Sequence, residues 1–232
     1  MRILVLIKHV ADPTQMGVSR STGALFEKSK RVLNPADEHA LEMAASLKAT
    51  TGAEVVCLTL GPAAAVDALR RGYAFGADVA YHVVAELDEN NAFARARALA
   101  EAVRSIEASR GPIDLMLAGT ASPMFSAGET AVRVAAQLDW PQVLRVKALR
   151  LVGNQVEAVR LSGDQESTVP LTLPCLAAID PTANRPRIPN AMLVMKAFKK
   201  EVTSLTLEGL GLPLERLVPA AALRLVRTYM PE

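Results

Sequence analysis

Apolar and polar positions alternate along this chain in blocks that predict a parallel α/β sheet. Short apolar runs are typical of strands buried on both faces, and the amphipathic segments between them have the period of helices. The predicted strands cover residues 3–8, 54–60, 79–84 and 115–118. The predicted helices lie near residues 35–50, 62–75 and 91–110, and another begins near Ser126. This alternation of strands and helices indicates the α/β fold class.

Two regions depart from that alternation. Residues 9–32 show no clear period, so an exposed excursion or a small hairpin is expected there. From residue 143 onward, apolar and polar residues alternate one by one, which is typical of antiparallel strands. Segments 145–151 and 155–161 flank a Gly-Asn pair that suits a tight turn, so a hairpin is predicted.

These patterns divide the chain into three parts. We predict an α/β core at residues 1–142, a strand-rich continuation of the same domain at 143–200 and a C-terminal tail at 201–232. The tail carries apolar residues that the central sheet does not need to bury, so we expect it to wrap a partner chain. These residues are Leu207, Leu210, Leu212, Leu214, Leu217 and Val218.

Composition and charge exclude several classes of protein. Half of the 232 residues are hydrophobic and 22% are charged, which indicates a folded chain with ample core. Basic residues number 26 against 24 acids, a balance that gives no electrostatic footprint for nucleic acid. No apolar stretch has the length of a membrane span, and the amino terminus passes directly into a strand pattern without a signal-peptide layout. We therefore expect a cytoplasmic protein that binds no nucleic acid and is not embedded in a membrane.

The sequence contains little catalytic machinery. It has no GxSxG, HExxH, P-loop or GxGxxG motif, and its three histidines lie on different predicted elements. Cys57 and Cys175 each lie inside an apolar run, which favours buried thiols over a redox pair or a metal site. We expect no catalytic residue and no metal site, which favours a binding or carrier subunit over an enzyme that acts alone.

Two helix starts are candidates for ligand binding. Asn34 is placed to cap the helix that follows, Pro35 suits its first turn, and Asp37 adds negative charge there. The loop that begins at Gly119 leads from a strand into a helix through small polar residues, as anion-binding loops do. An ordinary strand-to-helix connection has the same composition, so the residues alone leave both interpretations open.

Five stretches of sequence carry a family resemblance. In order they are "MRILVLIKHVADP", "LNPADEHALEMAASLK", "LGPAAAVDALRRGYAFGAD", "LAGTASPMFSAGETAVRVAAQLDWPQ" and "LTLPCLAAIDPTANRPRIPNAMLVMKAFKK". The most specific parts are the Asn-Pro before an acid-rich helix start, "GAD", "LDWPQ" at 138–142 and the "LTLP…D…N.PR" pattern. Together they resemble the β subunit of electron transfer flavoprotein over nearly the whole chain, as a divergent member.

The resemblance implies an open, mostly parallel Rossmann-like sheet of the adenine-nucleotide-binding type, flanked by helices. It implies an α subunit that holds most of the FAD, and an AMP, or a second FAD in some members, bound to the β subunit. In this family the heterodimer carries electrons from flavin-dependent dehydrogenases to a quinone oxidoreductase in the membrane. The β subunit has no bond-making residue of its own and acts by binding and orienting cofactors.

The family's nucleotide contacts fall on the ends of predicted strands and on helix starts of this sequence. The strand ends are Leu6 and Leu60. The first helix start is Asn34, Pro35, Ala36 and Asp37. The loop and second helix start are Gly119, Thr120, Ala121, Ser122, Ser126, Ala127, Gly128, Glu129 and Thr130. Typical members have a neutral glutamine where this chain has Glu129, so the resemblance implies a nucleotide site that is weakened, or else a pocket that is empty or remodelled.

The family's docking loop for dehydrogenases matches residues 185–200. Its anchoring leucine falls on Ala191, with Met192 and Leu193 beside it, so the anchor is altered. The alternative is an ordinary amphipathic helix that ends in a basic cluster. For the whole chain, the alternative function is a stand-alone adenine-nucleotide-binding, stress-type α/β protein that works as a homodimer.

Overall fold

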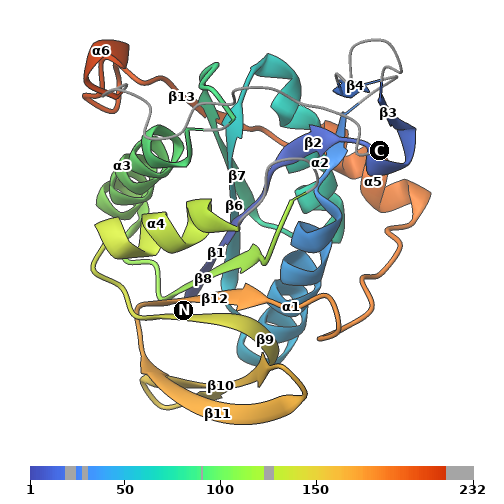
Figure 1. Cartoon of the computed structure of the whole chain (residues 1–232), viewed down its shortest axis with the longest axis vertical. Helices are drawn as coiled ribbons and strands as arrows, with labels where there is room; N and C mark the ends of the chain where they lie inside the picture. Colours follow the sequence, from blue (N-terminus) through green and yellow to red (C-terminus); the bar gives the residue numbers. More distant parts are fainter. Residues whose placement is uncertain (19–24, 28–30, 90, 123–127, 218–232) are drawn as a thin grey trace, which may run out of the picture.

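A nine-stranded sheet forms the centre of the protein in the computed structural model, which describes residues 1–18, 25–27, 31–89, 91–122 and 128–217 (Figure 1). The strand order is β11-β10-β9-β12-β8-β1-β6-β7-β13. Strands β12, β8, β1, β6, β7 and β13 run parallel to their neighbours. Their bounds are β1 Arg2–Leu6, β6 Glu54–Gly61, β7 Val79–Val84, β8 Leu115–Gly119, β12 Cys175–Ile179 and β13 Thr203–Leu205. The predicted α/β fold class and its four strands are confirmed.

Helices cover both faces of this parallel part. Helices α1, α2 and α5 lie on one face, and α3, α4 and α6 on the other (Figure 1). Their bounds are α1 Pro35–Thr51, α2 Val66–Phe75, α3 Ala92–Arg110, α4 Glu129–Gln137, α5 Ala191–Phe198 and α6 Leu214–Leu217, with short 3-10 turns η1 at Pro13–Gln15 and η2 at Ala63–Ala65. No helix in the described ranges is long and apolar enough to cross a membrane.

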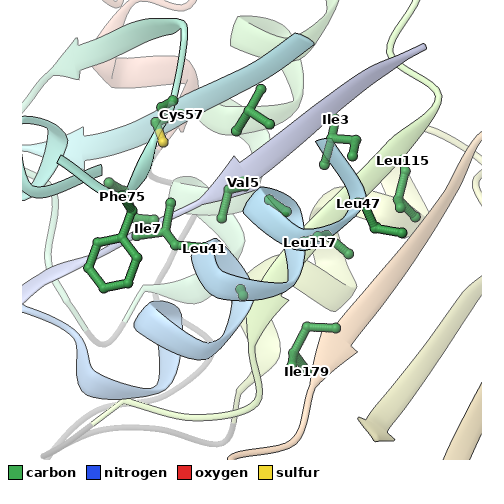
Figure 2. Packing of buried hydrophobic residues seen from close by; sticks show 14 of the residues in the cluster. Ile3, Val5, Ile7, Leu41, Leu47, Cys57, Phe75, Leu115, Leu117 and Ile179 are labelled. Atoms are coloured by element: carbon green, nitrogen blue, oxygen red, sulfur yellow. The ribbon is translucent and has the colours of Figure 1, made fainter. Parts of the chain in front are cut away.

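Alternate residues of β1 build two hydrophobic cores. Ile3 and Val5 face α1 and α2, whereas Leu4 and Leu6 face α3 and α4. Figure 2 shows the first core, in which Leu41 of α1 packs over the sheet. Full burial of a large aliphatic side chain contributes about 1.5–3 kcal/mol. Strands buried on both faces explain why the sequence showed continuous apolar runs.

The antiparallel region is larger than the sequence suggested. Strands β9 (Gln142–Val152) and β10 (Gln155–Ser162) form the predicted hairpin, and β11 (Gln165–Thr172) adds a third strand that was not predicted. This three-stranded unit extends beyond the helical layers at the lower end of Figure 1. The excursion after β1 forms two short pairs, β2 (His9–Ala11) with β5 (Arg31–Leu33) and β3 (Met16–Val18) with β4 (Leu25–Glu27).

The expectation that the tail leaves its apolar residues exposed is wrong for most of them. Leu207, Leu212 and Leu217 are buried in the core on the α3 face, and Leu210 packs against the same core. Leu214 is exposed, and Val218 lies outside the described residues. The sequence pattern identified apolar positions correctly, but it could not tell that this chain's own helices cover them.

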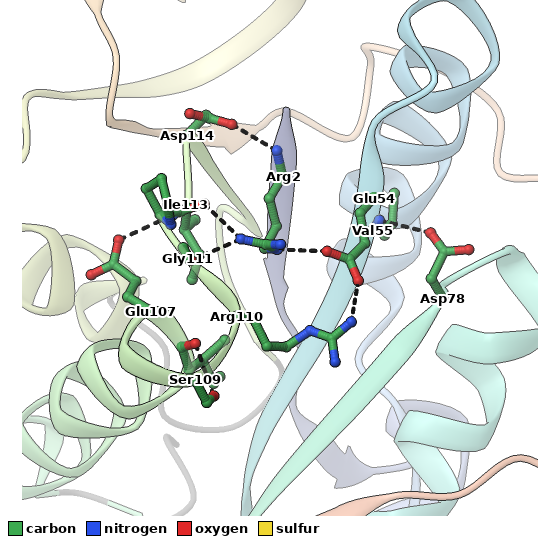
Figure 3. A network of polar contacts seen from close by, with 12 residues as sticks. Arg2, Glu54, Val55, Asp78, Glu107, Ser109, Arg110, Gly111, Ile113 and Asp114 are labelled. Atoms are coloured by element: carbon green, nitrogen blue, oxygen red, sulfur yellow. Dashed lines mark hydrogen bonds and ion pairs between the residues drawn. The ribbon is translucent and has the colours of Figure 1, made fainter.

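A network of polar contacts closes the amino edge of the sheet (Figure 3). The guanidinium of Arg2 pairs with Glu54, which also pairs with Arg110 at the end of α3. The backbone N–H of Arg2 donates to Asp114 at 2.7 Å. These contacts tie β1, β6 and the start of β8 together, so the opposite, carboxyl edge is the one available for ligands.

Candidate functional site

The site lies where β1 and β8 end side by side. From β1 the chain continues to β6 on one side, and it returns to β8 on the other side. Adjacent strands whose connections leave in opposite directions open a crevice at their carboxyl ends, which is where open α/β sheets bind ligands. Helix α1 begins directly above this crevice.

Asp37, in the first turn of α1, holds the crevice together. Its carboxylate accepts hydrogen bonds from the backbone N–H of Lys8 at 2.7 Å and of Gly119 at 3.1 Å. The side chain is 4% exposed. Burial raises the pKa of Asp37 to about 7, although the two backbone N–H donors act in the opposite direction. Each oxygen of Asp37 therefore accepts from a backbone N–H, so Asp37 holds the segments after β1 and at the end of β8 in position around the crevice.

Gly119 permits a close approach between β8 and the start of α1. A Cβ atom at Gly119 would lie 2.6 Å from the backbone carbon of Ala36 and 2.6 Å from Oδ1 of Asp37. Glycine is required here because a side chain would push the helix away from the strand. The sequence favoured Gly119 as part of an anion loop, and the structure supplies a packing reason for the same glycine.

Asn34 does not cap α1, so that expectation is wrong. Its side chain makes no cap hydrogen bond, although Pro35 does occupy the start of the helix as predicted. Instead Nδ2 donates to the carbonyl of Ala121 at 2.9 Å and ties the second loop to the first. Oδ1 has no hydrogen-bond partner among the described residues, and the side chain is 3% exposed. A buried acceptor without a partner is costly, and a ligand donor would satisfy it.

The other predicted nucleotide contacts surround the same crevice. Leu6 and Leu60 are buried at the ends of β1 and β6. Thr120 and Gly128 lie close together: a Cβ atom at Gly128 would be 2.1 Å from the carbonyl oxygen of Thr120. Thr120, Ser122 and Thr130 are half-buried there. Ser126 and Ala127 lie outside the described residues.

Glu129 is neutralised by its own helix. Arg133 donates to Oε2 of Glu129 from Nε at 3.0 Å and from Nη2 at 2.8 Å. The carboxylate is therefore paired one turn along α4. The pairing with Arg133 reduces the net negative charge at this position of the loop.

A second, small pocket lies beside the crevice, at the carboxyl ends of β1, β6 and β7. It contains three cationic side chains, Lys8, Arg31 and Arg95, and the carboxylate of Glu89. These residues were missed by the sequence analysis, because they come from separate segments with no motif spacing between them. Lys8 belongs to both the crevice and the pocket. Its backbone N–H donates to Asp37 in the crevice, and its ammonium lies in the pocket.

The predicted docking segment presents an apolar surface. Met192 is 64% exposed, and Leu193 and Ala191 beside it are exposed as well. Ile188, Met195 and Phe198 extend the same surface. The buried side of α5 packs on α2. An amphipathic helix that merely covered the core would turn polar residues outward, so an exposed apolar face favours contact with a partner.

The described residues contain no group of three or more His, Cys, Asp and Glu side chains that are placed to hold a metal ion. His39 shares a hydrogen bond with Asn184, while His82 lies in the core with Nε2 near the Gly61 carbonyl. Both cysteines are buried, and burial raises the pKa of Cys57 to about 12.

Comparison with known proteins gives the family. The model of the electron transfer flavoprotein domain matches residues 22–209. The chain belongs to the electron transfer flavoprotein family. It is 30% identical to the electron transfer flavoprotein subunit beta of Bacillus subtilis, over 100% of this chain and 88% of the relative.

Other relatives agree. The chain is 30% identical to the electron transfer flavoprotein subunit beta of Thermoanaerobacterium thermosaccharolyticum, over 90% of this chain and 80% of the relative. It is 29% identical to the caffeyl-CoA reductase-Etf complex subunit CarD of Acetobacterium woodii, over 100% of this chain and 88% of the relative. Membership of the electron transfer flavoprotein family, on the β-subunit side, supports an electron-transfer role in a complex that involves flavin.

Proposed function

We propose that this chain is the β subunit of an electron transfer flavoprotein, paired with an α subunit that holds most of the FAD. The heterodimer accepts electrons from a flavin-dependent dehydrogenase and passes them to a quinone oxidoreductase. The chain contributes no catalytic residue; it orients the flavin held by its partner and offers a docking surface. The part of residues 201–232 that does not pack on this chain's own core contacts the α subunit. The similarity to relatives named as β subunits over nearly the full chain carries this proposal.

The crevice is the place for an adenine nucleotide, with AMP as the expected ligand. Asn34 Oδ1 provides a buried acceptor that a ribose hydroxyl or an adenine amine satisfies. Gly119, Thr120 and the start of α4 frame the phosphate, where the helix dipole favours negative charge. Leu6 and Leu60 provide an apolar floor. AMP held there would join the two loops, since residues of both loops frame the crevice.

Co-expression tests the proposal. The chain is produced with the α subunit encoded in the same genome, purified as a complex, and analysed for flavin by absorbance and for nucleotide by acid release and chromatography. We expect one FAD and one AMP per heterodimer. Two FAD and no AMP would show that a second flavin occupies the crevice. A stable, colourless homodimer that does not bind the α subunit would contradict the proposal. It would support the alternative of a stand-alone, stress-type nucleotide-binding protein.

Site variants separate the two cofactors. Asn34→Ala removes the buried acceptor and is expected to reduce AMP content while FAD stays near one per heterodimer. Glu157→Gln, in the antiparallel unit far along the sheet from the crevice, is the control and leaves both unchanged. Retention of full AMP in Asn34→Ala would show that Oδ1 does not face the nucleotide.

A further inference from the structure

We propose that the pocket formed by Lys8, Arg31, Arg95 and Glu89, which shares Lys8 and Leu60 with the edge of the crevice, binds a phosphoryl group. Its cations come from the segment just after β1, from β5 and from the first turn of α3, and the fold brings them to one place. Three positive side chains face one carboxylate there. The excess positive charge suits a dianion, which a phosphoryl group carries at neutral pH.

The carboxylate of Glu89 already shows how the pocket holds an anion. Its Oε2 lies 3.1 Å from the Lys8 ammonium, and its Oε1 lies 2.8 Å from the Arg31 guanidinium. Burial raises the pKa of Glu89, but the positive charges of Lys8 and Arg31 outweigh it and lower the pKa overall. Glu89 therefore occupies part of the anion position and competes with a ligand for the same two cations.

The guanidinium of Arg95 uses few of its hydrogen-bond donors within the described part of the chain. Arg95 is 7% exposed, yet within the described part of the chain its guanidinium makes a single hydrogen bond, from Nη2 to the Leu60 carbonyl at 3.3 Å. Glu89 and Asp88 act on it only at longer range. A guanidinium carries five donors, and burying it with so few used is costly. The planar fork of Arg95 is suited to bind two oxygens of one phosphoryl group.

The backbone around the pocket favours the same charge. Gly61, Pro62 and Ala65 line the pocket and lead directly into α2 through the turn η2. The start of a helix carries partial positive charge, which adds to that of the side chains. Because the pocket is small, it takes the phosphoryl group of a ligand rather than a whole nucleotide.

Phosphate binding by the purified complex tests this site. Inorganic phosphate is titrated by isothermal calorimetry into wild type and three variants, with acetate at equal ionic strength as the reference anion. We expect Arg95→Gln to weaken phosphate binding by tenfold or more and Arg104→Gln, on the exposed side of α3, to leave it unchanged. Glu89→Gln removes the competing carboxylate and is expected to tighten binding several-fold. If Arg95 and Glu89 only supported the fold, their substitutions would not change the affinity for phosphate in opposite directions.

Several outcomes overturn the proposal. Equal binding of phosphate by wild type and Arg95→Gln shows that the pocket is not used, and so does equal binding of phosphate and acetate. If Arg95→Gln does not fold, Arg31→Gln at the rim replaces it and is expected to weaken binding at least threefold. FAD content stays unchanged in all variants, so failure of the pocket is distinguishable from failure of the electron-transfer assignment.

A second arm identifies the source of the phosphoryl group. The titration is repeated with the complex saturated with AMP. Loss of the Arg95-dependent phosphate signal shows that the nucleotide of the crevice reaches the pocket. Persistence of the signal shows that a separate phosphate compound binds there. Either result supports a phosphoryl site, and Asn34→Ala, which affects only the crevice, leaves the signal in place.

Discussion

Arg187 and Glu42 form a two-point ion pair between parts of the chain that are 145 residues apart. Nε and Nη2 of Arg187 each lie 2.7 Å from a carboxylate oxygen of Glu42, and the backbone N–H of Arg187 donates to the same group at 3.0 Å. Glu42 lies on α1, and Arg187 lies just before α5. The pair, helped by the hydrogen bonds between Asn184 and His39, fixes the docking segment to the helix that begins at the crevice.

We expect Arg187→Ala to loosen the docking segment without unfolding the protein. Bidentate pairs near the surface contribute about 1 kcal/mol, so the loss of global stability is small. Amide hydrogen exchange of residues 184–198 should become faster, because the loop loses its tie to α1. Arg133→Ala, which breaks an exposed pair on α4, is the control. Unchanged exchange in Arg187→Ala would show that the packing of α5 on α2 holds the segment alone.

Gly119→Ala is expected to destabilise the fold strongly. The new Cβ meets backbone atoms of Ala36, which have no rotamer to change, so β8 and α1 must separate. Overpacking of this kind costs about 3 kcal/mol, and urea unfolding measures it. Gly209→Ala is the control, since the nearest neighbour of its Cβ is the Thr206 hydroxyl at 3.2 Å. Equal midpoints for the two variants would contradict the close approach.

Much of this fold could be predicted from the sequence, because the information is local. The runs of β1, β6, β7 and β8 are apolar on both faces, and Pro35 suits the first turn of a helix but not its interior. The site could be predicted less well, because its contacts are distant. Asn34 obeys no capping rule here, since its amide reaches Ala121 from 87 residues away. Arg95 gave no signal, because neither Lys8 nor Arg31 stands at a recognisable spacing from it.

Asp37 gives the stability of the protein a specific pH dependence. Burial raises its pKa from 3.8 to about 7, so the folded state binds a proton that the unfolded chain releases between these values. The resulting stabilisation is complete below about pH 4 and is lost as the pH rises through 7. At about 1.4 kcal/mol per pKa unit, the change is on the order of a few kcal/mol.

Asp37→Asn removes this titration. Urea unfolding at several values of pH should show that wild type loses stability relative to the variant between about pH 4 and pH 7. The amide also loses one acceptor for a backbone N–H, so only the slope of the difference is diagnostic, not its offset. Asp164→Asn, in an exposed turn, is the control. A difference that stays constant with pH would mean that Asp37 does not titrate in this range.

The exposed face of α5 is expected to act in docking rather than in folding. Truncation of Met192 and Leu193 to Ala should leave the unfolding free energy within about 0.5 kcal/mol of wild type, because both side chains are exposed. Electron transfer from the donor dehydrogenase should slow, with about 1–3 kcal/mol of binding lost per side chain. Val194→Ala, on the side that packs against the core, should do the reverse. A large loss of stability in the double variant would show that the segment belongs to the core.

Glu129 and Arg133 together are expected to set the charge at the phosphate end of the crevice. A lone carboxylate repels a phosphate by about 1 kcal/mol in water and by more when shielded from it. Because Arg133 neutralises Glu129, we expect Glu129→Gln to change the affinity for AMP by less than about threefold. Arg133→Gln leaves the carboxylate unpaired and should weaken AMP binding by about tenfold.

The double variant decides between a charge effect and a packing effect. With both Glu129→Gln and Arg133→Gln, the charge is again balanced, so AMP affinity should return to near the wild-type value. Calorimetric titration of the nucleotide-free heterodimer measures all four proteins. Additive losses in the double variant would mean that Arg133 supports the loop by packing. Strong tightening by Glu129→Gln alone would mean that its carboxylate faces the phosphate despite the ion pair.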